Sequence, residues 1–265
     1  MRQFAVIGDP IEHSLSPILH GEIFRQLGID AKYQKFHVSS NSLDSFMSKN
    51  TFDGLNVTLP HKEKIIKYLD DLDTSAYSIG AVNCIFDNIG YNSDWIGFLR
   101  AMKINSIELE GKSCLIIGAG GVARSVAYAL IMARVASINV RNRSKDREKN
   151  LMMWIKEKFP NNTNNPFISY EAIINCTPIG MWPNTESVPS SKKMIEKASI
   201  LVDTIYNPTE TQWLKEGKKY GAKTLGGLDM FIAQGLASAD IWFQEKISEK
   251  IDPVKIRKEL ELELC

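Results

Sequence analysis

Cysteine and histidine are scarce in this sequence of 265 residues, which contains four of each. The cysteines form no C-x-x-C pair, and the histidines form neither an H-E-x-x-H motif nor a cluster. A disulfide framework and a structural zinc site both depend on such spacing. We therefore expect free thiols, as in a reducing cytoplasm, and no bound metal.

Net charge and long apolar runs are nearly absent as well. Lysine and arginine total 32 against 31 for aspartate and glutamate, so no overall field favours nucleic acid or an anionic membrane. No apolar run approaches the ~20 residues that span a bilayer. Met1 leads directly into the strand-like Phe4–Ile7, without the features of a signal peptide. We expect a cytoplasmic protein that binds neither nucleic acid nor a membrane.

The chain has an ordinary globular composition, with 44% hydrophobic and 24% charged residues. Its length exceeds the usual ~100–200 residues of one domain, so two domains are predicted. In the first hundred residues, apolar runs of strand type alternate with helical patterns. Strands are predicted at Phe4–Ile7, Tyr33–Val38 and Gly54–Val57, helices at Pro17–Leu27 and Lys62–Leu69, and a hairpin with arms Ala81–Phe86 and Tyr91–Asp94 before a helix from Trp95.

A second alternation begins at Gly111 and is typical of a parallel, doubly wound sheet. Strands are predicted at Ser113–Ile117, Ser137–Arg141, Ala172–Asn175 and Ile200–Asp203, a helix at Val122–Ala133, and a surface loop at Asn161–Pro166. The predicted fold is therefore α/β. It has an N-terminal α/β domain (1–100) and a Rossmann-like domain (101–234), with a cleft between them. The helix-favouring tail (235–265) is expected to pack back on the N-terminal domain.

A glycine-rich loop joins the first strand of this second domain to the helix that follows. It has the pattern G-x-G-x-x-A, formed by Gly118, Ala119, Gly120, Gly121, Val122 and Ala123. In a dinucleotide site the first glycine permits a tight turn and the second lets the backbone approach a pyrophosphate. The small last residue lets helix and strand pack closely. The placement between strand and helix favours this interpretation over a glycine-rich turn without a ligand.

The end of the following strand decides between the two dinucleotides. An NAD site places Asp or Glu there, ~20 residues beyond the glycines, to hold the ribose hydroxyls. This sequence instead has Asn142, Arg143 and Ser144, followed by Arg147. Guanidinium and hydroxyl groups suit a 2′-phosphate. We therefore predict that the protein prefers NADP(H) to NAD by tens-fold or more. The alternative is that the two arginines only begin a solvated helix.

Four short motifs in the first domain resemble the shikimate dehydrogenase family by their order and spacing, and the likeness extends over nearly the whole chain. They are Ser14-Leu15-Ser16-Pro17, Asn56-Val57-Thr58-Leu59-Pro60-His61-Lys62, Gly80-Ala81-Val82-Asn83 and Tyr91-Asn92-Ser93-Asp94-Trp95-Ile96-Gly97. Taken alone, a serine of the first motif is equally suited to capping a helix, and Lys62 would be expected on the solvated surface.

The resemblance implies which residues carry the chemistry. Lys62 would be the catalytic group and Asp94 its partner, while Ser14 and Ser16 would bind a substrate carboxylate. The other substrate ligands would be Asn56, Thr58, Asn83, Tyr206 and Gln234. Thr204, Gly227 and Met230 would lie at the nicotinamide.

The resemblance also implies an activity, the reversible NADPH-dependent reduction of 3-dehydroshikimate to shikimate in the chorismate route to aromatic amino acids. As hydride arrives, negative charge develops on the carbonyl oxygen, where the Lys62 ammonium can donate a proton. General acid catalysis of this kind contributes ~10²–10⁴-fold. We treat Lys62 and Asp94 as one coupled unit.

A few positions depart from the family pattern, and other functions remain as alternatives. Cys84 and Ser93 stand where threonine is usual, and Thr204 stands where a methionine often touches the nicotinamide. The alternatives are a quinate/shikimate dehydrogenase with NAD, a non-catalytic nucleotide-binding relative, and another two-domain oxidoreductase such as a methylene-tetrahydrofolate dehydrogenase. Retention of both Lys62 and Asp94 argues against the non-catalytic alternative. The sequence is compatible with a monomer or a homodimer.

Overall fold

The computed structural model describes residues 1–162 and 169–264, and its internal contacts divide the chain into two compact units. Unit 1 comprises Met1–Gly97 and Ile232–Glu263, and unit 2 comprises Phe98–Phe231 and Leu264. The chain leaves unit 1 within α4 (Asp94–Ile104) and returns to it within α9 (Leu228–Phe243). Of the helices described, none is long and apolar enough to cross a membrane.

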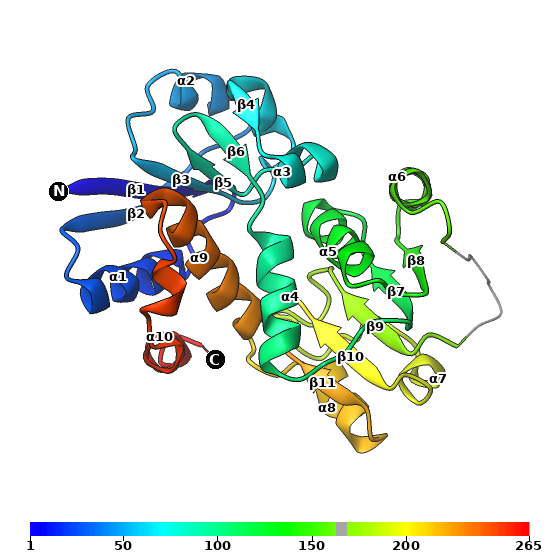
Figure 1. The fold of residues 1–265 in the computed structure, drawn as a ribbon. Coiled ribbons are helices and arrows are strands. Elements are labelled where there is room, and N and C mark those ends of the chain that lie inside the picture. The colour runs from blue at the N-terminus through cyan, green and yellow to red at the C-terminus, as the bar shows by residue number, and fades with distance from the viewer. Residues whose placement is uncertain (163–168, 265) are drawn as a thin grey trace. The chain divides into compact units, whose positions relative to one another are not determined.

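Unit 1 is built on a mixed sheet of six strands in the order β2-β1-β3-β5-β6-β4 (Figure 1). The strands are β1 (Arg2–Gly8), β2 (Ala31–His37), β3 (Gly54–Val57), β4 (Asp71–Leu72), β5 (Cys84–Phe86) and β6 (Ile89–Tyr91). β1 is parallel to β2 and β3, whereas β5 is antiparallel to β3 and β6. The helices are α1 (Ser16–Leu27), α2 (Leu43–Met47), α3 (Thr74–Ile79) and α10 (Pro253–Glu261), with 3₁₀ helices η1 (Lys64–Tyr68) and η2 (Ile247–Glu249).

The returning helix α9 supplies the largest aromatic side chain in the core of unit 1. Trp242 is 1% exposed, its ring centroid lies 4.8 Å from that of Phe4, and its Nε1 donates to the Ile85 carbonyl over 3.1 Å. A Cβ at Gly54, the first residue of β3, would lie 2.6 Å from the indole. Only glycine therefore leaves room for the ring at this position. The C-terminal segment is therefore an integral part of this core.

A tight hairpin brings two of the sequence motifs together. Asp87 and Asn88 form its turn with φ of 50° and 57°, the left-handed values that a type I′ turn requires between twisted antiparallel strands. Beyond β5 and β6 the pairing continues, because Asn83 N–H donates to the Tyr91 carbonyl over 3.0 Å. The hairpin thus places Asn83 beside the segment that ends at Asp94.

The helix predicted at Lys62–Leu69 is wrong in type and in length, since the structure has only the 3₁₀ helix η1. The reason lies in the first carbonyl of the segment. Lys62 C=O accepts the Val82 N–H over 2.8 Å and is therefore engaged outside its own segment. This bond ties the segment after β3 to the residues that precede β5.

Unit 2 is built on a parallel sheet of five strands in the order β11-β10-β9-β7-β8 (Figure 1). The strands are β7 (Ser113–Ile117), β8 (Ser137–Arg141), β9 (Ala172–Asn175), β10 (Ile200–Asp203) and β11 (Lys223–Leu225), and the helices are α5 (Gly121–Met132), α6 (Lys145–Lys158), α7 (Lys192–Ile195) and α8 (Gln212–Lys219). The strand order reverses between β7 and β9, and this is the place where doubly wound sheets bind ligands beyond the strand ends. The predicted Rossmann-like sheet is confirmed.

The predicted loop at Asn161–Pro166 lies partly outside the described residues, from residue 163 onward. The side chain of Asn162 accepts the backbone N–H of Ile138 over 2.8 Å and donates to its carbonyl over 2.9 Å. Asn162 thereby pairs with the free edge of β8 as a neighbouring strand would.

Candidate active site

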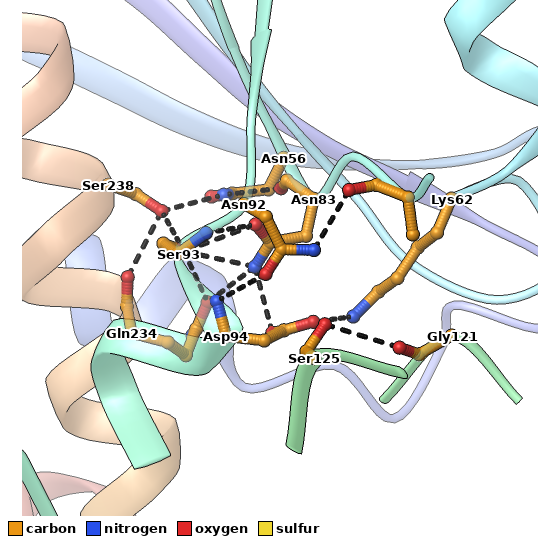
Figure 2. A network of polar contacts seen from close by, with 11 residues as sticks. Asn56, Lys62, Asn83, Asn92, Ser93, Asp94, Gly121, Ser125, Gln234 and Ser238 are labelled. Atoms are coloured by element: carbon orange, nitrogen blue, oxygen red, sulfur yellow. Dashed lines mark hydrogen bonds and ion pairs between the residues drawn. The ribbon is translucent and has the colours of Figure 1, made fainter. Parts of the chain in front are cut away.

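Lys62 and Asp94 meet inside unit 1. Lys62 Nζ lies 2.6 Å from Asp94 Oδ2, and the two side chains are only 9% and 8% exposed (Figure 2). The other carboxylate oxygen, Oδ1, accepts a hydrogen bond from Asn83 Nδ2 over 2.8 Å. Asp94 is the first residue of α4, and its own N–H donates to Asn92 Oδ1 over 3.2 Å. The lysine therefore has one fixed partner, and that partner is itself held by a neutral amide.

The turn after β3 explains why a lysine is buried here. Thr58 is half-buried; its N–H donates to the Ile7 carbonyl, and its own carbonyl accepts the His61 N–H, each over 2.9 Å. The His61 ring is fully buried and bonds the Val38 carbonyl over 2.5 Å through Nε2. Because the residue just before it is anchored in the core, Lys62 extends from a fixed backbone position rather than from a solvated helix.

A cluster of neutral polar groups surrounds the carboxylate. Asn83 Oδ1 accepts the Ser93 N–H over 2.6 Å, and Asn83 Nδ2 also lies 2.9 Å from Ser93 Oγ. Ser93 Oγ lies 3.0 Å from Ser238 Oγ on α9, and Gln234 Oε1 is 3.4 Å from Asn83 Nδ2 (Figure 2). Residues from the hairpin and from the C-terminal helix thus build one network.

Asn56 at the end of β3 has both of its amide hydrogens engaged within the protein. Nδ2 donates to the Asn83 carbonyl over 3.0 Å and to Ser238 Oγ over 3.1 Å. Oδ1 accepts the Tyr33 hydroxyl over 2.7 Å. Tyr33 stacks on His20 with ring centroids 4.4 Å apart. Burial lowers the pKa of His20 to about 3, so this ring is neutral at physiological pH.

The two predicted serines lie at the start of α1. Ser14 Oγ is 3.2 Å from Ser16 Oγ, and the Ser16 hydroxyl also interacts with the Tyr33 phenol. The N-cap position is Leu15, which provides no side-chain cap. Ser14 Oγ accepts the Ser16 N–H over 3.4 Å. Contacts run from Ser16 through Tyr33 to the Asn56 amide.

The glycine loop of unit 2 has the backbone shape that a dinucleotide site needs. Gly118 has φ of 115°, and a Cβ there would lie 2.9 Å from the Cys176 carbonyl. Gly120 is the N-cap of α5 and has no side-chain cap; a Cβ there would meet no atom within 4 Å. Ala123 is fully buried against the sheet, whereas Val122 and Ala119 are half-buried. Open space in front of uncapped helix N–H groups fits a pyrophosphate.

The segment after β8 carries both positive and negative charge. Arg143 and Arg147 are exposed, and neither forms a salt bridge within the described part of the chain. Ser144 is the N-cap of α6 and accepts the Arg147 N–H over 3.4 Å. Asn142, the residue after the strand, donates its N–H to Glu148 Oε2 over 2.7 Å. Glu148 is not predictable from the sequence pattern, because it lies one position beyond the Glu of a capping box.

The predicted nicotinamide contacts and Tyr206 gather after β10 in unit 2. Gly227 N–H donates to the Ile205 carbonyl over 2.8 Å, and a Cβ at Gly227 would lie 2.3 Å from the Thr204 carbonyl oxygen. Met230 is 9% exposed. The Tyr206 ring stacks on Phe231, with centroids 4.7 Å apart. Tyr206 therefore lies in the other unit from the remaining predicted substrate ligands.

A buried carboxylate fixes the start of this segment. Asp203 is 1% exposed; Oδ1 accepts from Asn175 Nδ2 over 3.0 Å and from the Ile205 N–H over 3.1 Å, and Oδ2 accepts from Thr211 Oγ1 over 2.9 Å. Burial raises the pKa of Asp203 from 3.8 to about 7, although these three donors oppose the rise. In the part of the chain that is described, no group of three or more His, Cys, Asp or Glu could hold a metal.

Asp203 should make the stability of the protein fall as the pH rises from about 4 to about 7. In that window the folded carboxyl keeps a proton that the unfolded one has lost, so folding is favoured at the acidic end. The free energy of unfolding then decreases by at most about 1.4 kcal/mol per pH unit. Urea unfolding at several pH values should show this decline in the wild type and a flatter profile in Asp203→Asn. Parallel profiles would contradict the expectation.

Known proteins match this chain along its length. Residues 6–85 match the substrate binding domain of shikimate dehydrogenase, and residues 100–178 match the family described as shikimate / quinate 5-dehydrogenase. The NADP(+)-dependent shikimate dehydrogenase of Methanococcus maripaludis is 40% identical over 252 residues, which covers 89% of this chain and 90% of that protein.

Solved structures give the same result. The shikimate 5-dehydrogenase of Thermus thermophilus, in complex with NADP(H) and shikimate, has a TM-score of 0.88 at 31% identity and covers 100% of both chains. The enzyme of Listeria monocytogenes, in complex with shikimate and NAD, has a TM-score of 0.84 at 30% identity and covers 98% of this chain and 96% of that one. The chain therefore belongs to the shikimate dehydrogenase family.

Proposed function

We propose that this protein catalyses the reversible reduction of 3-dehydroshikimate to shikimate with NADPH, a step in the biosynthesis of chorismate and the aromatic amino acids. The observation that carries the proposal is the buried ion pair of Lys62 and Asp94, 2.6 Å apart, with Asn83 on the second carboxylate oxygen. Such a pair can move a proton where water is largely excluded. Membership of the family supports the choice of substrate.

Lys62 acts as the acid in the reductive direction. When bound, NADPH supplies the hydride that reduces the ring carbonyl carbon. Lys62 donates a proton to the oxygen of that carbonyl, on which negative charge develops, and is reprotonated from solvent afterwards. Asp94 and Asn83 orient the ammonium before the substrate arrives, which lowers the entropic cost of the transfer. In the oxidative direction the neutral lysine accepts the hydroxyl proton.

The remaining polar groups of unit 1 bind the substrate in this proposal. Ser14 and Ser16 hold the carboxylate with their paired hydroxyls, 3.2 Å apart. Asn56 accepts a ring hydroxyl through Oδ1, since both of its amide hydrogens already have partners. Thr58, Asn83, Tyr206 and Gln234 complete the predicted set.

Unit 2 binds the cofactor in this proposal. The pyrophosphate lies at the glycine loop, Gly118–Ala123, in front of the N-terminus of α5, where Gly120 leaves open space. The 2′-phosphate is held by the segment after β8, through Asn142, Arg143, Ser144 and Arg147. Thr204, Gly227 and Met230 contact the nicotinamide.

A spectrophotometric assay at 340 nm tests the proposal directly. Shikimate and quinate are each offered with NADP⁺ and with NAD⁺, and we expect the fastest reduction of nicotinamide with shikimate and NADP⁺. Quinate is the second candidate because the family matched by residues 100–178 includes quinate in its description. Faster turnover of quinate would favour that candidate, and no turnover of either substrate despite cofactor binding would indicate a non-catalytic relative.

Three further properties stay predictions from the sequence. We propose a cytoplasmic location, a monomer or homodimer, and no binding to nucleic acid. The near balance of charge, 32 basic against 31 acidic residues, supports the last of these.

A further inference from the structure

The segment after β8 contains features of both an NADP site and an NAD site. In dinucleotide-binding folds an arginine at the end of the second strand accommodates a 2′-phosphate, whereas a carboxylate there accepts the free ribose hydroxyls of NAD. By sequence position Asn142, Arg143 and Ser144 occupy this place. In three dimensions Glu148 returns to it from α6, with Oε2 2.7 Å from the backbone nitrogen of Asn142, the first residue after the strand.

Glu148 is held there as a charged group. Lys145 Nζ lies 2.9 Å and 3.1 Å from its two carboxylate oxygens, and the Glu148 side chain is 23% exposed. Partial burial acts to raise the pKa of Glu148, but the Asn142 N–H and the Lys145 ammonium outweigh it and hold the pKa below its usual range. The carboxylate is therefore ionised at neutral pH.

The ion pair also changes the charge available to a phosphate. Lys145 is the first residue of α6 and pairs with Glu148, whereas the side chains of Arg143 and Arg147 form no salt bridge with any residue that the structure describes. A carboxylate beside a dianionic 2′-phosphate repels it. The same carboxylate does not repel a ribose hydroxyl and can accept a hydrogen bond from it. One residue thus acts against one cofactor and not against the other.

We propose that Glu148 is a specificity-determining residue that weakens 2′-phosphate binding and narrows the preference of this protein for NADP(H) over NAD(H). The inference rests on the proposed function for the identity of the cofactors. It goes beyond it by assigning the degree of discrimination to one carboxylate.

The test measures the dissociation constants of NADPH and NADH by titration calorimetry with wild type, Glu148→Gln and Glu148→Ala. Glutamine still accepts the Asn142 N–H through its amide oxygen but carries no charge. We expect Glu148→Gln to bind NADPH about 3- to 10-fold more tightly and NADH with little change. The gain should shrink as salt is added, because exposed charges are screened.

Two further variants separate this effect from general ones. Glu157→Gln removes a charge from the same helix, near its other end, where Glu157 is 71% exposed and pairs with Lys158, and it should leave both constants unchanged. Arg143→Ala should act in the opposite direction and weaken NADPH alone.

Equal affinity of Glu148→Gln and wild type for NADPH would overturn the inference. So would a parallel loss of both nucleotides in Glu148→Ala with no change in Glu148→Gln, which would make Glu148 only a support for the segment. Failure of the proposed function is distinguishable, since it would appear as absent turnover of shikimate while the shift in NADPH affinity persists. Absence of binding of either nucleotide would overturn both.

Discussion

Replacing Lys62 with alanine is expected to lower kcat for shikimate oxidation by about 10²–10⁴-fold while KM changes far less. The Lys62 side chain is 9% exposed and its Nζ lies 2.6 Å from the Asp94 carboxylate, so the ammonium is held in position. In the proposed mechanism its contribution belongs to proton transfer in the transition state. Steady-state kinetics in both directions measure the two constants separately.

Lys64→Ala is the matched control for this experiment. Lys64 lies two residues further along, is exposed, and contacts Ser40 Oγ over 3.0 Å. Its removal should leave kcat and KM within about twofold, as for an ordinary surface change. A large rise in KM at unchanged kcat in Lys62→Ala would make Lys62 a binding residue only. Circular dichroism of the variant checks the fold, because breaking a buried ion pair costs about 3–5 kcal/mol.

Replacing Trp242 with alanine is expected to lower the free energy of unfolding of unit 1 by about 3–5 kcal/mol. The indole is 1% exposed, lies with its centroid 4.8 Å from the tilted Phe4 ring and donates to the Ile85 carbonyl. Gly54 leaves the space that it fills. Alanine would leave a cavity and an acceptor without its donor. Urea unfolding followed by circular dichroism gives the difference.

Trp182→Ala provides the comparison for that measurement. Trp182 is 44% exposed, so its loss should change stability by no more than about 0.5 kcal/mol. A similar cost for the two tryptophans would contradict the role given to the α9 indole in the core of unit 1.

The sequence predicted the elements whose pattern is local. The strands at Gly54–Val57, Ser113–Ile117 and Ile200–Asp203 agree with the structure to the residue, because apolar runs between turn signals mark buried strands. The glycine loop was equally local, since strand, glycines and helix follow one another directly. The helix at Lys62–Leu69 failed because a distant N–H, that of Val82, engages its first carbonyl.

The partners around Lys62 and Asp94 could not be predicted in the same way. Ser238 lies 182 residues from Asn56 in sequence, and nothing in either segment signals their contact. Tyr33 lies in an apolar run that predicts a strand. That pattern does not indicate the hydrogen bond that its hydroxyl donates to Asn56. The individual roles of Lys62 and Asp94 came from family resemblance, because a lone lysine is most often solvated. Such contacts depend on tertiary packing rather than on local propensity.

Unit 1 is formed by two separate segments of the chain, and this affects the order in which the two units can fold during synthesis. Synthesis proceeds from the N-terminus, and domains generally fold as units once they are complete. All strands of unit 2 and residues 98–231 are synthesised before Trp242, whereas the sheet begun by the first residues still lacks the indole over Gly54. Unit 1 is therefore the first unit to begin synthesis and the last to have a complete core.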